Sequence, residues 1–312
     1  MAALPGLGRK LALGSLGAAA IGGTGGYFMY RQRLKDNKAV TAAAFNARQD
    51  PEKLRAALAW VRTAAAQPGA SSSSGPSLEL FRYTTCPYCG KAKAFLDYFG
   101  IPHTAIEVEP MFKSQLQASE YKKLPQLRLG GASGAWLVDS EIIVDTLAEE
   151  VGVAAQLRDP EVQRWRTWAS ESLVRHVTLN INKSLVSAWQ GYAYIDAFDT
   201  IPLINKLFLK VVGAPVMYLV ATKKTFPTLV KAGELQPGDD WRAVLHRQVD
   251  DFVAKAGICD QRPFHGGKKP DLADLDVYGV FQSVRGHEIY DDLVQNTSIG
   301  AWMKGMDRLT GK

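Results

Sequence analysis

The chain has 312 residues, enough for two domains of ordinary size, and its 46% hydrophobic and 22% charged residues support a sizeable core. The net charge of +6 does not indicate nucleic-acid binding, because the basic residues are scattered and are not interleaved with aromatic side chains. Three cysteines in a chain of this length exclude a disulfide-stabilised scaffold.

The N-terminal region contains an uncharged run, Leu11–Tyr30, whose length matches one crossing of a lipid bilayer. Basic residues flank the run and are more numerous after it, between residues 31 and 38. Residues 1–36 are therefore predicted to be a single membrane anchor, with the rest of the chain facing the cytosol or an organelle matrix. The mitochondrion and the Golgi are both compatible with this prediction. A cleaved targeting peptide is the alternative, because the region is rich in Ala and Gly and no acidic residue precedes Asp36.

Small residues recur at every fourth position of the run, at Gly14, Ala18, Gly22 and Gly26. Such a stripe lets two membrane helices approach closely, and a homodimer is predicted. Residues 37–77 are predicted to form a helical spacer and a flexible, Ser-rich linker, so that the first domain begins at Leu78.

The tetrad Cys86-Pro87-Tyr88-Cys89 follows a short apolar run, Ser77–Phe81, and precedes an amphipathic stretch. This pattern predicts a strand, a tight turn and a helix that begins beside Cys86. Unpaired backbone N–H groups and the helix dipole favour the thiolate form of Cys86 at that position. Pro87 suits the first helical position, and Cys89 lies one turn further, near enough to form or resolve a disulfide. Such a thiol pair requires a reducing compartment.

A zinc site is the less favoured interpretation of the two cysteines. The remaining cysteine, Cys259, and the five histidines do not complete a zinc-ligand spacing with the tetrad. No metal is therefore predicted, and Cys259 and His265 are interpreted as core or loop residues.

After the tetrad, short apolar strands alternate with helical stretches. The predicted strands cover residues 102–108, 124–129 and 135–138, with a hairpin at the glycines between the last two, and the predicted helices cover 112–121 and 141–151. This order is that of a thioredoxin-like, glutaredoxin-type α/β domain, here assigned to residues 78–154.

Two dipeptides in this domain are candidates for ligand binding. Pro125 is expected to be cis, exposing the backbone of Leu124 for antiparallel pairing with a peptide-like ligand. Ser140, at the start of a predicted helix, can donate its hydroxyl and N–H to a carboxylate. Simple capping of that helix by Asp139 or Ser140 is the structural alternative.

Beyond residue 155 the strand patterns stop, and residues 155–312 are predicted to form an all-α domain. Helices are predicted over residues 161–177, 201–221, 241–256 and 272–284. The stretch Ile201–Ala221 is long and apolar, but its lysines, Lys206 and Lys210, favour a buried or groove-lining helix over a second membrane span.

A thioredoxin-like half followed by an all-α half is the plan of glutathione transferases. Within that superfamily, residues 78–310 resemble the membrane-associated prostaglandin E synthase type 2 family. The resemblance is carried by the tetrad with residues 91–97, by Tyr121–Pro125 and Asp139–Ile143, and most specifically by residues 262–280, RPFHGGKKPDLADLDVYGV.

The resemblance implies that Cys86 is the catalytic thiol and that Tyr83 lines the site, with Cys89 as a second thiol whose role is open. It implies that glutathione is bound by Leu124, the residue before Pro125, and by the pair Asp139-Ser140. Strand-end packing remains the alternative role for Tyr83. Related members bind haem together with glutathione, and haem here would be ligated through the tripeptide's thiol. The segment Asp271–Asp274 resembles the helical-domain capping box and is interpreted as structural.

Two functions follow from this resemblance. The first is isomerisation of a lipid substrate, a prostaglandin endoperoxide (H2), to prostaglandin E2 by the Cys86 thiolate, which suits a membrane anchor and an apolar cleft between the domains. The second is a glutathione-dependent thiol–disulfide oxidoreductase, or a glutathione- and haem-binding protein, without a synthase role. A membrane-tethered interaction protein is a third, non-enzymatic alternative, against which the intact C-x-x-C motif argues.

Overall fold

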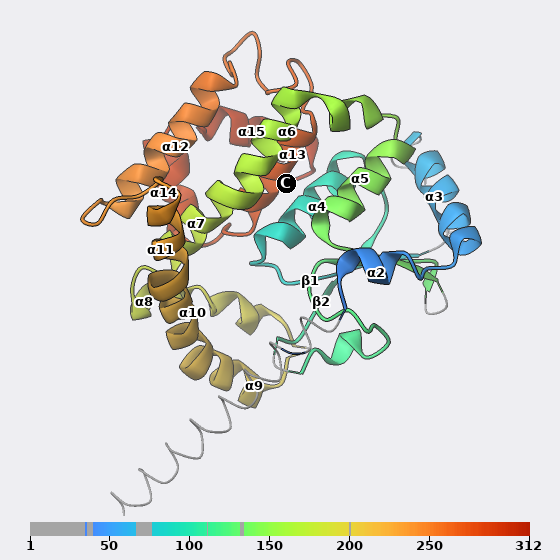
Figure 1. Cartoon of the computed structure of the whole chain (residues 1–312), viewed down its shortest axis with the longest axis horizontal. Helices are drawn as coiled ribbons and strands as arrows, with labels where there is room; N and C mark the ends of the chain where they lie inside the picture. The colour runs from blue at the N-terminus through green and yellow to red at the C-terminus, as the bar shows by residue number, and fades with distance from the viewer. Residues whose placement is uncertain (1–34, 36–39, 67–76, 111, 132–133, 200) are drawn as a thin grey trace, which may run out of the picture.

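The computed structural model describes Lys35 and residues 40–66, 77–110, 112–131, 134–199 and 201–312. The predicted anchor Leu11–Tyr30, its small-residue stripe and the Ser-rich linker lie outside the described residues. Figure 1 shows two parts side by side, a small α/β part and a larger all-α part.

The α/β part is built on a four-stranded sheet with the order β2-β1-β3-β4. Strand β1 pairs in parallel with β2 and antiparallel with β3, and β4 pairs antiparallel with β3. Helices α4 and α5 pack against each other beside this sheet. The elements are β1 (Leu78–Arg82), α4 (Pro87–Tyr98), β2 (Thr104–Glu107), β3 (Gln126–Leu129), β4 (Ala135–Val138) and α5 (Ser140–Glu150). This is the predicted thioredoxin-like topology.

Successive side chains of a strand point to opposite faces of the sheet, and apolar side chains lie on both faces here. Leu80 and Leu127 belong to the large core shared with the helices, whereas Phe81 and Trp136 belong to a smaller cluster on the other face. The sheet is therefore buried on both sides, and its central strands are rigid supports for the loops at their ends.

The prediction of a helix over residues 112–121 is wrong, because the structure has only the short 3₁₀ turn η1 (Ser114–Leu116) there. Lys113 adopts a left-handed backbone conformation with φ 52°, which interrupts a right-handed helix. The Lys122 ammonium donates to the carbonyls of Leu116 and Ser119, at 3.0 and 2.6 Å. Side-chain hydrogen bonds thus replace the helical ladder in this loop.

Helices α2 (Ala42–Asn46) and α3 (Pro51–Ala66) pack onto the α/β part, although the sequence predicted a spacer here. Asn46 hydrogen-bonds both backbone groups of Val138 in β4, at 2.9 and 3.0 Å, and Gln49 accepts from the N–H of Trp136 at 2.8 Å. Val61 is fully buried in the main core. These helices therefore cover the open edge of the sheet, which would otherwise present unpaired backbone groups.

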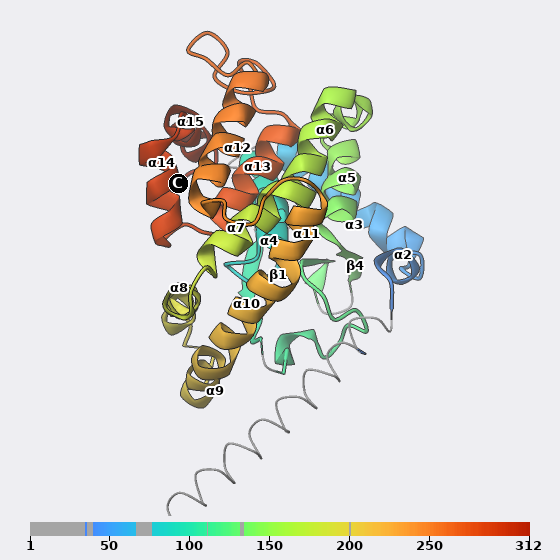
Figure 2. The ribbon, with the colours of Figure 1, turned by 60° about the vertical axis from the view of Figure 1, so that its left-hand side comes forward.

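The all-α part surrounds a nearly fully buried helix, α13 (Leu272–Gln282). Figure 2 shows α6, α7 and α12 around it. Aromatic rings pack at the centre, with Trp168 stacked on Phe252 and Trp302 edge-on to Phe252. The other elements are η3 (Ala154–Arg158), α6 (Pro160–Trp168), η4 (Ala169–Leu173), α7 (Val174–Ile181), α8 (Leu185–Gln190), η5 (Ala193–Ala197), α12 (Trp241–Lys255), α14 (Glu288–Asn296) and α15 (Gly300–Leu309).

The two parts meet where α4 crosses α13. A Cβ placed on Gly90 would lie 2.0 Å from the carbonyl oxygen of Gly279, so the two backbones are in direct contact. Beside this crossing, Asp276 of α13 accepts from Lys91 of α4 at 3.0 Å and from Arg166 of α6 at 3.1 Å. A buried carboxylate with two cationic partners fixes the relative position of the two parts.

One long helix runs from Leu203 to Lys231, with two π-helical turns. Its pieces are α9 (Leu203–Phe208), η6 (Leu209–Gly213), α10 (Ala214–Val220), η7 (Ala221–Thr225) and α11 (Phe226–Lys231). Only 11% of its most apolar window is buried, so of the two predicted roles the buried helix is wrong, and the groove-lining helix stays a prediction. Among the described residues, it is the one helix long and apolar enough to cross a membrane.

Candidate functional site

Cys86 lies at the junction of the β1–α4 turn and helix α4. It is the N-cap residue, with φ −90° and ψ 118°, and Pro87 occupies the first helical turn. The turn is closed by a hydrogen bond from the Cys86 N–H to the carbonyl of Tyr83 at 3.1 Å. The thiol is partly exposed, whereas Cys89 is buried inside the helix. This is the strand, turn and helix arrangement that the sequence predicted.

The two thiols have opposite electrostatic environments. A hydrogen bond from the Cys89 side chain is the main cause that lowers the pKa of Cys86, and the backbone N–H groups of Cys89 and Tyr88 lower it further against the effect of burial. Burial, followed by the interaction with Cys86, raises the pKa of Cys89 well above its ordinary value. Cys86 is thus the thiol suited to act as a thiolate, and Cys89 is the thiol that stays protonated and donates to it.

Glu107 lies at the end of β2, beneath the turn that carries Cys86. Its carboxylate accepts from the N–H and the hydroxyl of Thr84, both at 2.8 Å, and Arg82 lies 3.8 Å away. Burial raises the pKa of Glu107, and its negative charge acts to raise the pKa of Cys86. The carboxylate therefore holds the turn in place at some cost to thiolate stability.

The peptide bond between Leu124 and Pro125 is cis, as predicted. Pro125 is buried, and Leu124 is half-buried against the smaller apolar cluster. Within the described part of the chain, no hydrogen bond engages the N–H or C=O of Leu124. An extended ligand could therefore pair with this backbone in the way an added strand would.

The pair Asp139-Ser140 starts helix α5. Asp139 is the N-cap, and its carboxylate accepts from the N–H of Glu141 at 3.0 Å, so the capping role is present. Its φ of 80° is a conformation that residues with side chains rarely adopt. The Asp139 N–H donates to the carbonyl of Pro125 at 3.3 Å, which brings the helix start next to the Leu124 backbone. Ser140, 5% exposed, has a hydroxyl that no described residue hydrogen-bonds.

Tyr83 and Tyr88 occupy different positions around the thiols. Tyr83 is half-buried and packs against the same apolar cluster as Leu124, in agreement with strand-end packing. Its backbone N–H acts on Cys89 and lowers the pKa of that thiol. Tyr88 is exposed, and its hydroxyl lies 3.4 Å from the carbonyl of Ser170 in η4.

Two residues of the all-α part interact with the residues around the thiols, and no sequence pattern marked them. Tyr194, in η5, hydrogen-bonds the Thr85 side chain, and burial raises the pKa of its hydroxyl. Arg175, in α7, lies close enough to Tyr88 to act on its pKa, as do Asp139 and Glu141. The turn that carries Cys86 and the start of α4 therefore have neighbours from both parts of the chain, with a neutral phenol beside the thiol turn.

The five histidines of the chain make their contacts away from Cys86. Four of them lie beside a carboxylate, in the pairs His103–Asp97, His176–Glu234, His246–Asp292 and His265–Asp271. The fifth, His287, is the N-cap of α14. The predicted ligation of haem through the thiol of glutathione needs no protein imidazole, and it stays a prediction.

One group of potential metal ligands is present in the described residues, formed by His265, Asp271 and Asp274. The Asp274 oxygens accept from four N–H groups, three in the backbone and one on Trp302. Asp271 and Asp274 form the reciprocal capping box of α13 that the sequence predicted. Because these hydrogen bonds already occupy the carboxylates, we interpret the group as structural.

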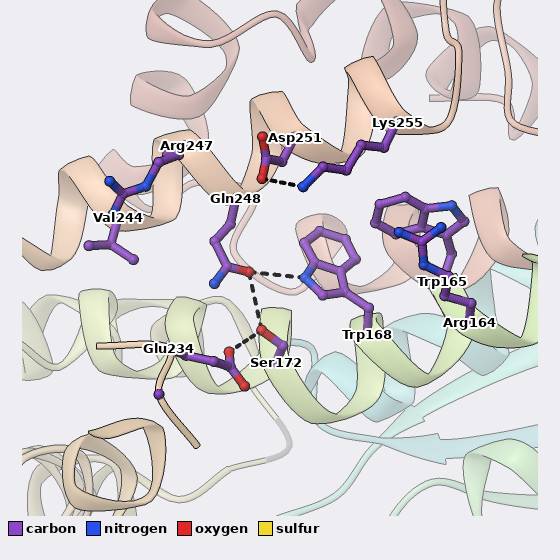
Figure 3. Close-up of a pocket in the computed structure, with 11 residues that line it drawn as sticks. Arg164, Trp165, Trp168, Ser172, Glu234, Val244, Arg247, Gln248, Asp251 and Lys255 are labelled. Carbon is purple, nitrogen blue, oxygen red and sulfur yellow. Dashed lines mark hydrogen bonds and ion pairs between the residues drawn. The ribbon is translucent and has the colours of Figure 1, made fainter. Parts of the chain in front are cut away.

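A separate cavity of about 450 Å³ lies between α6, η4 and α12 (Figure 3). Gln248 accepts from the indole N–H of Trp168 at 3.0 Å, and the hydroxyl of Ser172 donates to Glu234 and lies 3.2 Å from the Gln248 side-chain oxygen. These bonds attach the loop after α11 and helix α12 to η4. The cavity does not include Cys86.

Residues 80–155 match the family model of the glutathione S-transferase N-terminal domain. The chain is 29% identical over 282 residues to prostaglandin E synthase 2 of Mus musculus, covering 76% of this chain and 71% of the relative. It is 27% identical over 279 residues to prostaglandin E synthase 2 of Danio rerio, covering 75% and 71%. The chain is thus similar to these proteins over three quarters of its length, and residues 80–155 are similar to the glutathione S-transferase N-terminal domain. The resemblance and the fold class predicted from the sequence are thereby confirmed.

Among solved structures, the chain is similar to glutaredoxin 2 of Salmonella typhimurium in complex with glutathione, with a TM-score of 0.46, 15% identity and coverage of 76% of this chain and 96% of that one. It is also similar to glutathione transferase Omega 3C of Trametes versicolor, with a TM-score of 0.44, 15% identity and coverage of 82% and 95%.

Proposed function

We propose that the chain is a glutathione-binding isomerase that converts a prostaglandin endoperoxide (H2) to prostaglandin E2 through the Cys86 thiolate. The observation that carries this proposal is the position of Cys86 at the start of α4, with the Cys89 thiol donating to it. The names of the two relatives supply the substrate class.

The proposed reaction begins when the Cys86 thiolate attacks one oxygen of the peroxide. A sulfur–oxygen bond forms, the oxygen–oxygen bond breaks, and the second oxygen takes the electron pair as an alkoxide. The carbon that bears the sulfur-linked oxygen then loses its proton, a C=O bond forms, and the thiolate leaves. The alkoxide takes up one proton from a donor, and the proton lost from the carbon restores that donor, so that the reaction is an isomerisation with no net redox change. Tyr194, whose raised pKa keeps its hydroxyl neutral, is the candidate donor to the alkoxide.

Glutathione would bind beside the thiolate through two features of the α/β part. The Leu124 backbone would pair with the cysteinyl residue of the tripeptide, and the hydroxyl and N–H of Ser140 at the start of α5 would hold the γ-glutamyl carboxylate. The hydrogen bond from Asp139 to Pro125 keeps these two features adjacent. The match of residues 80–155 to the glutathione S-transferase N-terminal domain also supports glutathione binding.

A glutathione-dependent thiol–disulfide oxidoreductase is the second candidate function. The contact between the Cys86 and Cys89 side chains favours it, because a resolving thiol must reach the nucleophile. In that reaction the Cys86 thiolate attacks a disulfide and forms a mixed disulfide, which Cys89 or glutathione then resolves. Both reactions would use the same cleft.

We also propose that residues 1–36 anchor the protein in a membrane and that the protein is a homodimer. The uncharged run Leu11–Tyr30 and its small-residue stripe support both proposals. N-terminal sequencing of the native protein tests the anchor, since a start beyond Arg33 would show that the segment is cleaved.

The deciding experiment incubates the purified full chain with prostaglandin endoperoxide or with a small disulfide, each with and without glutathione. We expect endoperoxide conversion that Cys86→Ser abolishes and Cys89→Ser largely retains. Equal loss in both variants, together with reduction of the disulfide by the parent chain, would replace the isomerase with the oxidoreductase.

A further inference from the structure

The outer side of the long helix Leu203–Lys231 is the most exposed apolar region in the described part of the chain. Twelve large apolar side chains are exposed among the described residues, and nine of these twelve lie on α8, α9, η6 and α10. Their exposed fractions range from 39% to 82%. We call this region the α8–α10 surface; its members are Leu185, Val186, Trp189, Leu203, Ile204, Leu207, Val211, Val216 and Leu219.

The helix is amphipathic in spite of its apolar composition. Leu209, Ala214, Ala221, Thr225 and Leu229 are buried and face the rest of the all-α part. The exposed apolar residues on α9, η6 and α10 follow mostly at spacings of three and four, with one step of five, from Val211 to Val216, at η6. Because a π-helical turn inserts an extra residue, η6 keeps the exposed residues before and after it on the same side of the helix. Helix α8 packs beside α10 and adds its own exposed residues, including Trp189.

The charges on this helix all have one sign. Leu203–Lys231 contains five lysines and no acidic residue: Lys206, Lys210, Lys223, Lys224 and Lys231. Lys223, Lys224 and Lys231 are exposed. Two carboxylates precede the helix, of which Asp196 is paired with Lys210 at 2.5 Å and Asp199 is exposed. An apolar outer face on a helix that carries exposed lysines and no acidic residue is the pattern of a helix that lies in the interface of an anionic lipid bilayer.

We propose that the α8–α10 surface docks onto the surface of an anionic membrane, with the lysines toward the lipid headgroups. This contact is additional to any N-terminal anchor and does not depend on the proposed reaction. The helix would lie on the bilayer and would not cross it, because Ala221 and Leu229 are buried in a cluster with Leu179 and Val244 of the folded part. A second copy of the chain is the poorer occupant, since a two-fold contact would bring like-charged lysines together.

Docking by this surface would place the cleft next to the lipid. Segment η5, which lies between α8 and α9 in the chain, carries Tyr194 and its hydrogen bond to Thr85, the residue before Cys86. Figures 1 and 2 both place α8 and α9 at one end of the molecule and α15 at the other. A probe on α15 is therefore a matched control for a probe on α9.

The test uses the full chain carrying Cys86→Ser, Cys89→Ser and Cys259→Ser, with one new cysteine labelled with an environment-sensitive fluorophore. Leu207→Cys reports on the α8–α10 surface, and Leu309→Cys, at a residue of similar exposure in α15, is the control. Both are reconstituted in phosphatidylcholine vesicles with or without phosphatidylglycerol, and both contain a lipid-borne quencher. Because any N-terminal anchor tethers both probes equally, the contrast between them measures docking.

We expect the probe at position 207 to shift to the blue and to be quenched in anionic vesicles, while the probe at 309 changes little. Lys223→Gln with Lys224→Gln should reduce the quenching at 207 by about twofold or more. Equal quenching at both positions, or none at 207, would overturn the proposal. A blue shift of the probe at 207 that depends on protein concentration in the absence of vesicles would overturn the proposal in favour of a second copy of the chain. If the probe at 207 were quenched equally in the double lysine variant and in its parent, the proposed contact of the lysines with the headgroups would be wrong. Circular dichroism of each variant checks that it is folded.

Discussion

The hydrogen bond from Cys89 to Cys86 predicts how two substitutions at one position will differ. Cys89→Ala removes the donor that contributes most to the lowered pKa of Cys86, whereas Cys89→Ser replaces it with a hydroxyl that can still donate. A hydrogen bond to a charged group contributes about 1.5–3 kcal/mol, and a thiol is a weak donor, so we take the lower end of that range. Since one pKa unit corresponds to about 1.4 kcal/mol, Cys89→Ala should raise the pKa of Cys86 by about one unit.

The measurement is the rate of iodoacetamide alkylation as a function of pH, in a Cys259→Ser background so that the exposed third thiol does not contribute. Because only the thiolate reacts, the Cys89→Ala profile should move to higher pH, and its rate below the pKa should fall by about tenfold. The Cys89→Ser profile should stay close to that of the parent, and Cys86→Ser should abolish the reaction. An unchanged profile in Cys89→Ala, or identical profiles for the alanine and serine variants, would refute the reasoning.

Three further predictions concern glutathione, the domain contact and the N-terminal helices. Ser140→Ala should weaken glutathione binding by about 1–2 kcal/mol in calorimetry, and unchanged affinity would leave Ser140 with no role beyond the start of α5. Gly279→Ala should lower the free energy of unfolding by at least about 2 kcal/mol in urea titration, because its Cβ would lie 2.4 Å from the N atom of Lys91. A variant as stable as the parent would show that α4 and α13 can move apart at no cost. A chain that starts at Val40 should keep the melting temperature of the folded body, whereas one that starts at Leu78 should melt lower and aggregate, because it lacks α2 and α3; equal melting temperatures would show that these helices do not support the sheet.

The sequence alone determined the features that depend on local pattern. The strand, turn and helix around Cys86 were predicted because they depend on residues within one or two turns of one another. The cis peptide bond at Pro125 was expected from its place in the predicted fold and the capping box of α13 from the family resemblance, and the structure has both. The thioredoxin-like order of elements followed from the same local patterns, except at residues 112–121. There the left-handed backbone of Lys113 and the Lys122 hydrogen bonds, rather than helix propensity, set the conformation.

Only the tertiary structure decided which residues that are far apart in the sequence are in contact. Helix α2 meets the edge strand β4 through Asn46 and Val138, and Tyr194 meets the thiol turn, although these partners are far apart in the chain and no periodicity marks them. The sequence also could not reveal which side of the helix Leu203–Lys231 is buried. An apolar stretch with lysines is compatible with a core helix or an exposed one, and the choice depends on how many neighbours the fold supplies to cover it. Here the fold covers one side and leaves the other exposed.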